Sequence, residues 1–250
     1  MRLQDKVAVV TGSGSGFGEA IALRFAAEGA RVVVNCRSRE SGERVLSRIE
    51  RAAGPGRALF VAADVATEAG WERIAQEALG NFGRVDILVN NAGLNQPVVP
   101  MLEVDEETLD RLFAVNFKSI YFSARNVVPL MRAQGGGVII NNASIAAKRP
   151  RKGQTWYAGI KAGVVALTKA MALELGPDRI RVNALCPVMT RTPMIDAKLT
   201  PEREARAISE IPLGRLGETR DLANAALFLA SDEAEFLTGV ALEIDGGRSI

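Results

Sequence analysis

Residues 6–18 read Lys6-Val7-Ala8-Val9-Val10-Thr11-Gly12-Ser13-Gly14-Ser15-Gly16-Phe17-Gly18, an apolar run that leads into a glycine-rich turn. Glycine allows the backbone to turn sharply and lets another group approach it closely. A helix that starts directly after such a turn presents unpaired backbone N–H groups, which suit a phosphate. The stretch therefore predicts a strand, a nucleotide-binding turn and a helix, although a purely structural turn would look the same in isolation. The glycine spacing differs from G-x-G-x-x-G, and no Gly-Lys-Ser/Thr follows, which excludes a Walker A loop.

The rest of the chain repeats this alternation of short apolar runs and longer segments with helical periodicity. Continuous apolar runs are typical of strands that are covered on both faces. We expect strands at 6–10, 31–34, 58–62, 85–89, 138–140, 181–185 and 241–244. We expect helices at 16–28, 40–52, 68–81, 106–132, 155–175 and 220–231. This order predicts right-handed crossovers and an α/β fold, a doubly wound parallel sheet within one domain spanning 1–250.

Residues 188–212 interrupt the alternation, because a long charged segment separates the sixth strand from the next clear helix. Loops of this length inside compact domains are usually functional or mobile. Ligands of open α/β sheets bind outside the carboxyl ends of the strands. We therefore expect a substrate lid at 188–212; the alternative is a solvated insertion with a short helix at 201–211.

The composition excludes several kinds of catalysis. The chain has no histidine, so a Ser-His-Asp triad, an HExxH zinc site and an imidazole base are all ruled out. Cys36 and Cys186 form no CxxC pair, so we expect no metal site and no disulfide framework. Acid–base chemistry is left to Tyr, Lys, Asp or Glu. Two isolated cysteines and no signal segment favour a cytoplasmic protein.

The overall charge is nearly balanced. Lys and Arg number 31 against 29 Asp and Glu, a net charge of +2, which is too small to indicate a nucleic-acid partner. Long uncharged stretches contain Asn, Gln, Gly and Pro, so we expect no membrane span.

The end of the second strand bears on which dinucleotide is bound. A carboxylate about 20 residues after the glycine turn binds the ribose 2′-hydroxyl of NAD. Here Arg37 and Arg39 follow Cys36, and no carboxylate occupies the strand end. A guanidinium can form paired hydrogen bonds with a 2′-phosphate, so the sequence favours NADP over NAD, with a solvated basic turn as the alternative.

Tyr157 and Lys161 are the most informative pair, with Ser144 13 residues upstream of the tyrosine. A spacing of four places both on one helical face. A neighbouring ammonium stabilises a phenolate, so we expect Lys161 to lower the pKa of Tyr157. Ser144 follows a strand and could hydrogen-bond a substrate carbonyl or alkoxide. Alone, however, a Tyr and a Lys four residues apart are common on protein surfaces.

Taken together, these motifs resemble the short-chain dehydrogenase/reductase family along essentially the whole chain. The matching positions are Thr11-Gly12-x-x-x-Gly16-x-Gly18, Asp64, Asn90-Asn91-Ala92-Gly93, Asn116, Ser144, Tyr157-x-x-x-Lys161, Pro187 and Thr192. The resemblance implies a Rossmann-like three-layer sandwich with about seven parallel strands, and hydride transfer with a nicotinamide cofactor. It implies that Tyr157 exchanges the proton, Ser144 orients the substrate oxygen, Lys161 tunes Tyr157 and holds the nicotinamide ribose, and Asn116 anchors a water.

The resemblance also implies cofactor contacts from the glycine turn, from the strand ends and from the segment after the sixth strand. With Arg37, these residues are Gly12, Ser13, Ser15, Gly16, Phe17, Gly18, Asp64, Val65, Asn90, Ala92, Gly93, Tyr157, Lys161, Pro187, Val188 and Thr192. Val188 stands where the family usually has glycine, and Phe17 replaces the usual Ile or Leu. Structural roles remain open for some of them: Asn90 and Asn91 could tie strands together, Asn116 could bend its helix, and Asp64 could cap the next one.

Within the family, 211–217 and Asp245-Gly246-Gly247 are most similar to 3-oxoacyl-carrier-protein reductases, so an NADPH-dependent ketoreductase is expected. A glucose or polyol dehydrogenase and a non-catalytic nucleotide-binding regulator are the alternatives. Lys148, Arg149, Arg151 and Lys152 could receive an acidic carrier, or could simply form a solvated loop. The nearly all-apolar segments 109–131 and 158–173 predict a dimer at least, and the resemblance suggests a homotetramer.

Overall fold

The computed structural model describes residues 1–197 and 199–250. In these residues the main sheet has seven strands, all parallel, in the order β3-β2-β1-β4-β5-β6-β9. The strands are β1 (Val7–Thr11), β2 (Arg31–Cys36), β3 (Ala58–Ala62), β4 (Ile87–Asn90), β5 (Gly137–Asn142), β6 (Ile180–Pro187) and β9 (Ala241–Ile244). The expected doubly wound Rossmann-like sheet is confirmed.

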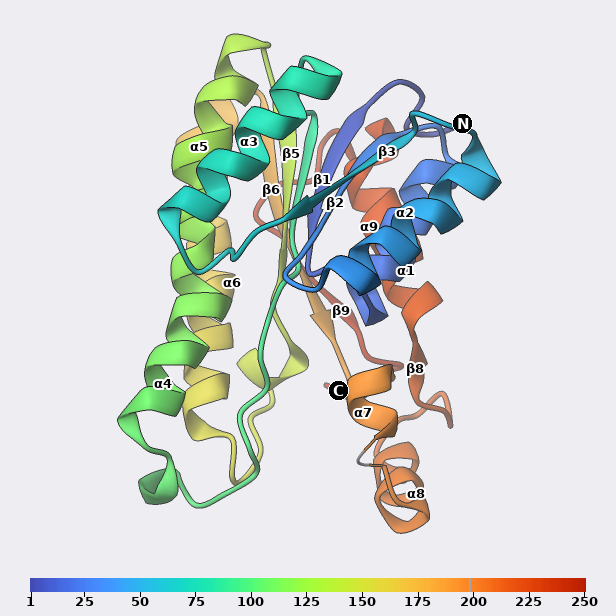
Figure 1. The fold of residues 1–250 in the computed structure, drawn as a ribbon. Helices are drawn as coiled ribbons and strands as arrows, with labels where there is room; N and C mark the ends of the chain where they lie inside the picture. Colours follow the sequence, from blue (N-terminus) through green and yellow to red (C-terminus); the bar gives the residue numbers. More distant parts are fainter. Residues whose placement is uncertain (198) are drawn as a thin grey trace.

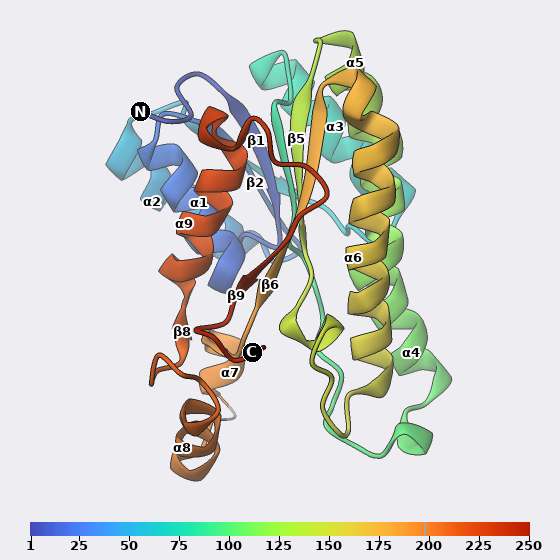
Figure 2. The same cartoon turned by 180° about the vertical axis from the view of Figure 1, so that it is seen from behind.

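Helices cover both faces of the sheet, as Figures 1 and 2 show from opposite sides. One face carries α1 (Gly16–Ala27), α2 (Arg39–Ala53) and α9 (Thr219–Ala230). The other carries α3 (Glu68–Phe82), α4 (Glu106–Phe113), α5 (Ser119–Ala133) and α6 (Thr155–Leu175). Short helical turns lie at η1 (Met101–Glu103), η3 (Ile145–Ala147), η4 (Gly176–Asp178) and η5 (Asp232–Ala234).

Strand β1 shows why these runs carry no polar interruption. Ala8 and Val10 pack into the hydrophobic core beneath α1 and α9, whereas Val9 packs into the core beneath α3 and α5. Successive side chains of a strand point to opposite faces, so a strand covered on both sides is apolar along its length. The one polar residue of β1, Thr11 at its end, donates a hydrogen bond to the carbonyl of Val89. All five residues of β1 are buried.

The strand order reverses between β1 and β4, which pair with each other although α1, β2, α2, β3 and α3 separate them in sequence. Val10 is in register with Val34 on one side and with Val89 on the other. The crossovers leave this point in opposite directions, so the connecting loops separate and open a crevice at the carboxyl edge of the sheet.

The expected continuous helix at 106–132 is wrong in one respect. A π-helical turn, η2 (Ala114–Lys118), separates α4 from α5. The Asn116 amide donates to the carbonyls of Leu112 (3.0 Å) and Leu94 (3.1 Å), and its Oδ1 accepts from Leu94 N–H (3.1 Å). A side chain that competes for backbone groups in this way widens the turn, and such turns often occur at functional sites.

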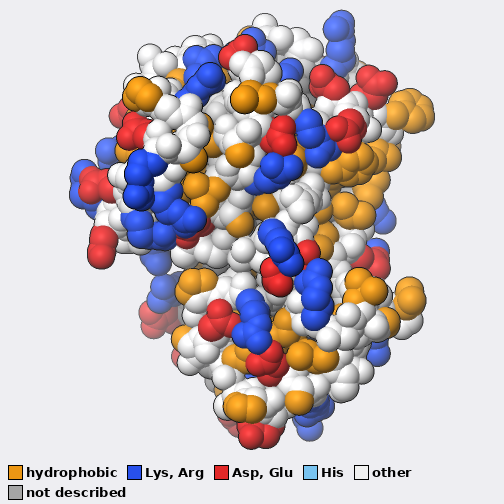
Figure 3. Space-filling model, turned by 90° about the vertical axis from the view of Figure 1, so that its right-hand side faces the viewer, with side chains coloured by type: hydrophobic (Ala, Val, Ile, Leu, Met, Phe, Trp, Pro, Cys, Tyr) orange, Lys and Arg blue, Asp and Glu red, His pale blue; other side chains and the backbone are white. Residues whose placement is uncertain are grey.

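Residues 188–212 lie below the carboxyl edge of the sheet. They contain β7 (Thr190–Arg191), which pairs with β8 (Gly217–Glu218), and the helices α7 (Pro193–Asp196) and α8 (Pro201–Ser209); Lys198 lies outside the described residues. Val188 and Ile211 pack with Ile145 in a small hydrophobic cluster that anchors both ends of the segment. Figure 3 shows the resulting narrow waist above the lobe that contains α7 and α8, with basic and acidic side chains mixed on this face. Among the described helices, none combines the length and the apolar character needed to cross a membrane.

Candidate active site

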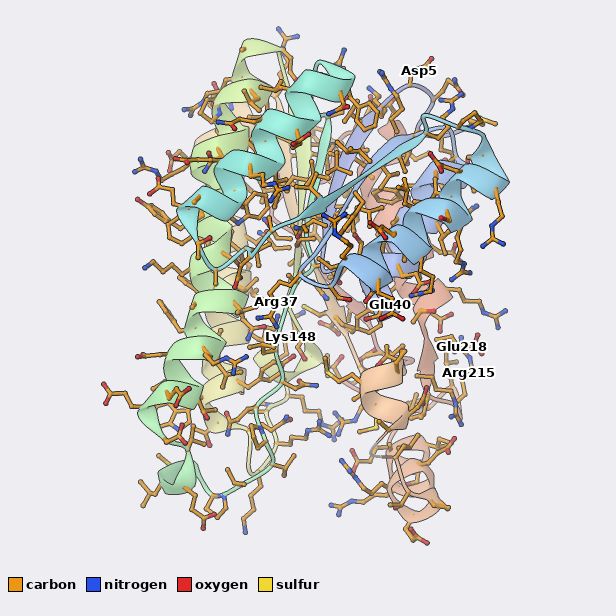
Figure 4. The ribbon with its side chains drawn as sticks, in the orientation of Figure 1. Asp5, Arg37, Glu40, Lys148, Arg215 and Glu218 are labelled. Atoms are coloured by element: carbon orange, nitrogen blue, oxygen red, sulfur yellow. The ribbon has the colours of Figure 1, made fainter. Side chains whose placement is uncertain are left out.

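A cavity of about 810 Å³ lies at the carboxyl edge of the sheet, below the point where the strand order reverses. The described residues that line it come from the ends of β1 to β6, the π-helical turn, the loop before α6 and the start of α6. Others come from 187–195, from α8 with the residues after it, and from Arg248 near the C-terminus. Figure 4 shows the labelled Arg37 and Lys148 near this end of the sheet, whereas Asp5 lies at the opposite end. A large cavity therefore lies at the place where ligands of open α/β sheets are expected to bind.

The glycine turn forms one wall of the cavity. Gly12 and Gly16 have φ angles of +63° and +58°, which L side chains rarely adopt. A Cβ at Gly12 would lie 2.9 Å from the Cα of Ala92, and one at Gly16 would lie 3.6 Å from Thr192. Ser15 is the N-cap of α1, but its side chain makes no capping hydrogen bond. The first N–H groups of α1 therefore have no side-chain cap, a geometry that suits a phosphate.

Two residues of the same turn have structural roles. Gly18 does not line the cavity; a Cβ there would lie 2.5 Å from the carbonyl oxygen of Gly12, so glycine is needed for packing. The Ser13 side chain is buried and donates to the carbonyl of Val10 (2.8 Å). The side chain of Ser13 is therefore occupied within the turn, and the expected contact of Ser13 with the cofactor stays a prediction.

The far end of the cavity is formed by the ends of β2 and β3. Arg37, Asp64 and Val65 all line it, and Arg37 Nη1 lies 4.0 Å from Asp64 Oδ2. Thr67, not Asp64, caps α3; Asp64 Oδ1 instead accepts from the N–H of Ala66 (2.9 Å).

Asn90 was expected to contact the cofactor, but its side chain points away from the cavity. It donates to Asn141 Oδ1 (2.9 Å) and so links β4 to β5, and Asn90 is not among the cavity-lining residues. Asn91, which we did not assign, does line the cavity, and its amide donates to the carbonyl of Thr11 (2.8 Å). Both asparagines therefore tie strands together, the structural alternative considered above.

Ser144, Tyr157 and Lys161 come together on the substrate side of the cavity. Ser144 and Tyr157 both line the cavity, and the Ser144 hydroxyl acts on Tyr157 to lower its pKa. Lys161 is buried, and its Nζ donates a hydrogen bond to the carbonyl of Asn142 (2.7 Å). The same Nζ lies 5.8 Å from the centre of the Tyr157 ring. Tyr157 and Lys161 lie four residues apart on α6, and Ser144 follows the end of β5, so the three residues come together as expected.

The ionisation of this group differs from the expectation. Burial raises the pKa of Tyr157, and it outweighs the hydrogen bond from Ser144 and the positive charge of Arg151, which both lower it. Burial also lowers the pKa of Lys161 from its ordinary 10.5 to about 8. The expected lowering of the Tyr157 pKa by Lys161 is therefore contradicted here, because the buried ammonium itself is destabilised and faces a backbone carbonyl.

Asn116 and Gly93 line the part of the cavity between the glycine turn and the group formed by Ser144, Tyr157 and Lys161. Asn116 lines the cavity from the π-helical turn, and a Cβ at Gly93 would lie 2.8 Å from its Oδ1 and 3.8 Å from Lys161 Nζ. The absence of a side chain at Gly93 thus keeps open the space that joins the glycine turn to Tyr157. This shape fits an extended dinucleotide lying from Arg37 to Lys161.

The remaining expected residues also line the cavity: Phe17, Ala92, Pro187, Val188 and Thr192. Val188 is buried in the cluster with Ile145, which explains a branched residue at this position. Sequence reasoning missed Gln96 and Gln154, two buried glutamines that hold the loop before α6. Only the tertiary structure brings them together, because 58 residues separate them.

Comparisons with known proteins identify the family of the chain. The family model described as enoyl-(acyl carrier protein) reductase matches residues 12–249. The 4-formylbenzenesulfonate dehydrogenase of Comamonas testosteroni is 44% identical over 254 residues, which covers 100% of both chains.

Solved structures extend the agreement to the fold. A 3-ketoacyl-(acyl-carrier-protein) reductase from Brucella melitensis, complexed with NADH, has a TM-score of 0.92 at 44% identity, covering 99% of this chain and 100% of that one. A 7α-hydroxysteroid dehydrogenase complexed with NADH has a TM-score of 0.94 at 36% identity, covering 98% of this chain and 95% of that one. The chain therefore belongs to the short-chain dehydrogenase/reductase family and is an NAD(P)-dependent oxidoreductase.

Proposed function

We propose that this protein is an NADPH-dependent ketoreductase that interconverts a ketone and a secondary alcohol, with Tyr157 as the proton donor. The observation that carries the proposal is that Ser144, Tyr157 and buried Lys161 line one cavity, with Lys161 Nζ 5.8 Å from the centre of the Tyr157 ring. A bound nicotinamide supplies or accepts the hydride. No histidine is available to take over the proton transfer.

Each catalytic side chain has a separate task in this proposal. The hydroxyls of Ser144 and Tyr157 both donate to the substrate oxygen, and Tyr157 gives up its proton as the alcohol forms. In the reverse direction Tyr157 accepts that proton. Lys161 holds the nicotinamide ribose, and Asn116, whose side chain holds the backbone of Leu94, keeps the wall behind Lys161 in place. Positioned acid–base groups of this kind contribute about 10²–10⁴-fold to rate.

The cofactor would lie along the glycine turn and the strand ends. Gly12 and Gly16 allow close approach of the pyrophosphate, and the N-terminus of α1 offers its N–H groups. Val65 and Asp64 would contact the adenine, and Thr192 the carboxamide; Ser15, Phe17, Ala92, Gly93, Pro187 and Val188 complete the walls. We further propose that 188–212 act as the lid over this site.

Arg37 supports NADP as the preferred cofactor. It directly follows β2, which contains no carboxylate, its side chain is 66% exposed, and its ion-pair contact with Asp64 is long at 4.0 Å. A guanidinium in that position can bind a 2′-phosphate in a bidentate manner. The two solved relatives named above were complexed with NADH, so the preference is a property to be measured on this chain.

The double variant Cys36→Asp/Arg37→Leu tests the cofactor proposal. It should shift the kcat/KM ratio toward NADH, because it adds a 2′-hydroxyl acceptor and removes the phosphate partner. Arg39→Leu is the matched control, since Arg39 pairs with Glu43 at 2.9 Å and does not line the cavity. An NADPH/NADH ratio that the double variant leaves unchanged would remove the reason for choosing NADP.

The family relatives point to carbonyl and alcohol substrates of several kinds, and we propose a 3-oxoacyl thioester or a similar ketone. The direct test is oxidation of NADPH and NADH, followed at 340 nm, with acetoacetyl-CoA, acetoacetyl-N-acetylcysteamine, a diketone and a steroid ketone. Glucose and xylitol are assayed in the oxidative direction. Turnover of the sugars alone would reject the ketoreductase proposal in favour of a polyol dehydrogenase.

We propose that the chain assembles as a dimer or tetramer through the face that carries α4, α5 and α6. Phe113, Tyr121 and Leu173 expose 46%, 52% and 83% of their surface there. The helix α6 buries only one face within the chain although it is apolar nearly all round. A monomeric mass in small-angle scattering would contradict this assembly.

A further inference from the structure

The charge of the cavity is very different from the charge of the whole chain. Among the described residues that line it, eight are Lys or Arg and two are Asp or Glu, whereas the chain carries a net charge of only +2. Arg37 and Lys161 belong to the proposed cofactor site. The other six gather around the substrate end: Arg149, Arg151, Lys152, Arg203, Arg206 and Arg248. The substrate end therefore carries a strong positive charge.

Arg151 is held in place by a buried polar network. Its Nε donates to Gln154 Oε1 (2.7 Å), and Gln154 in turn donates to the carbonyl of Gln96 (3.2 Å). Gln96 Oε1 accepts from the N–H of Tyr157 (2.9 Å), at the start of the catalytic helix. Gln96 and Gln154 are only 2% and 3% exposed. The network thus links Arg151, which is itself solvent-exposed and lines the cavity, to the backbone of Tyr157 through two buried glutamines.

Neighbouring cations are engaged in other interactions. Arg248 pairs with Glu210 through its Nε (3.1 Å), and the carbonyl of Arg248 accepts a hydrogen bond from Arg149. Lys148, the first residue of the basic stretch, pairs with Glu243 and does not line the cavity. Arg151, by contrast, forms no ion pair with a carboxylate of the described chain. A guanidinium ordered by buried glutamines but lacking an anion is arranged to bind one.

The position of Arg151 relates it to the substrate rather than to the cofactor. It precedes α6 by four residues and lines the same cavity as Tyr157, at the opposite end from Arg37. Three hydrogen bonds through Gln154 and Gln96 connect its guanidinium to the N–H of Tyr157, and its positive charge lowers the pKa of the Tyr157 hydroxyl. Figure 4 shows nitrogen-ended side chains reaching into the space between these loops and α8.

We infer that Arg151 binds an anionic group of the substrate itself, so that the preferred substrates are small keto acids or hydroxy acids whose carboxylate or sulfonate lies within reach of the carbonyl. This inference rests on the proposed ketoreductase function and adds a substrate class to it. The phosphates of a CoA or carrier thioester offer the same oxyanion chemistry, but the position of Arg151 close to Tyr157 favours a charge on the substrate's own carbon skeleton.

The test compares matched charged and neutral substrates. Three keto acids of increasing span, 4-oxopentanoate, 6-oxoheptanoate and 4-acetylbenzoate, are each paired with the corresponding primary amide, which has nearly the same shape. Wild type, Arg151→Gln, Arg151→Lys and the control Arg73→Gln are assayed with NADPH. Arg73 is exposed on α3 and does not line the cavity, so its variant removes the same charge from elsewhere.

Wild type should prefer the best keto acid over its amide, and Arg151→Gln should reduce kcat/KM for the acid by about 10- to 100-fold, as expected for a lost charge-assisted hydrogen bond. The amide should change by no more than about threefold, and Arg151→Lys should restore part of the preference. Arg73→Gln should leave the preference unchanged. Equal loss for acid and amide would show that Arg151 only supports the loop and would overturn the inference.

Two further arms separate the inference from the proposed function. Calorimetric binding of each acid and amide to the NADPH complex measures the anion preference without turnover. Equal affinities for acid and amide would overturn the inference even if ketones are reduced. An affinity preference for the acid that Arg151→Gln abolishes would support anion recognition even without turnover. Failure to turn over any ketone of the panel would refute the ketoreductase proposal separately. An Arg151→Gln effect confined to acetoacetyl-CoA and absent with acetoacetyl-N-acetylcysteamine would assign the arginine to the carrier phosphate and overturn the small-acid class.

Discussion

Lys161 carries a stability penalty that its replacement should reveal. The side chain is 4% exposed, and burial lowers the pKa of its ammonium from 10.5 to about 8. This difference in the Lys161 pKa between the unfolded and folded states destabilises the folded state by about 3 kcal/mol at any pH where the folded protein holds Lys161 protonated. The penalty applies in full below pH 8, where both states carry the charge. It shrinks between pH 8 and 10.5, where only the unfolded state is charged, and it disappears above 10.5, where both states are neutral.

Lys161→Met removes this penalty and also removes the donor to the Asn142 carbonyl, a loss that costs about 1–3 kcal/mol at every pH. The two effects separate by their pH dependence. Relative to the variant, wild type should therefore gain up to about 3 kcal/mol of unfolding free energy as the pH rises from 7.5 to 10.5. Near neutral pH the variant should be as stable as wild type or more so, although it should lose activity.

Urea unfolding of the cofactor-free protein, followed by circular dichroism at fixed protein concentration, measures this difference. Lys169→Met is the matched control, because Lys169 is an exposed lysine on the same helix and its ammonium keeps its hydration. A difference between wild type and Lys161→Met that stays constant from pH 7.5 to 10.5 would refute the reasoning. It would mean that Lys161 is solvated or paired in solution.

Three other predictions concern catalysis and packing. Tyr157→Phe should lower kcat by about 10²–10⁴-fold while the Kd for NADPH, measured by fluorescence titration, stays unchanged; equal rates would reject Tyr157 as the acid. Gly18→Ala should cost about 1–3 kcal/mol in urea unfolding, because its Cβ would meet the Gly12 carbonyl oxygen at 2.5 Å, whereas Gly80→Ala on α3, with open space around it, should be neutral or stabilising. Arg151→Gln should shift the pH–rate profile for oxidation of a neutral alcohol toward higher pH, because the Arg151 charge lowers the pKa of Tyr157; a shift toward lower pH would contradict that assignment.

Strand and helix positions were predictable to within a few residues. Buried parallel strands such as β1 produce continuous apolar runs, and a glycine turn followed by a helix is a local signal. The break between α4 and α5 was not predictable, because it depends on Asn116 bonding to the backbone of Leu94, 22 residues away. Local periodicity continues straight through this break, so no window of sequence reveals it.

The candidate site divides in the same way. Family motifs brought Ser144, Tyr157 and Lys161 to attention, and the structure brings these residues together in one cavity. The expected cofactor residues Ser13 and Asn90, however, hydrogen-bond through their side chains to the backbone and to the neighbouring strand. A motif indicates which residues matter, whereas the direction of each side chain depends on its neighbours across the sheet.

The amino-acid sequence on its own was sufficient for the doubly wound sheet, which follows from the periodicity of the linear chain. The nicotinamide cofactor and the expectation of a tyrosine-based reaction followed from the resemblance of several motifs to one family, since spacing along one helix and the lack of histidine only left room for them. The charge of the cavity and the ionisation of Tyr157 and Lys161 became clear only in three dimensions. Burial and electrostatic interaction depend on which distant segments meet, and a net charge of +2 gives no sign that six cations from the loop before α6, α8 and the C-terminus surround one substrate site.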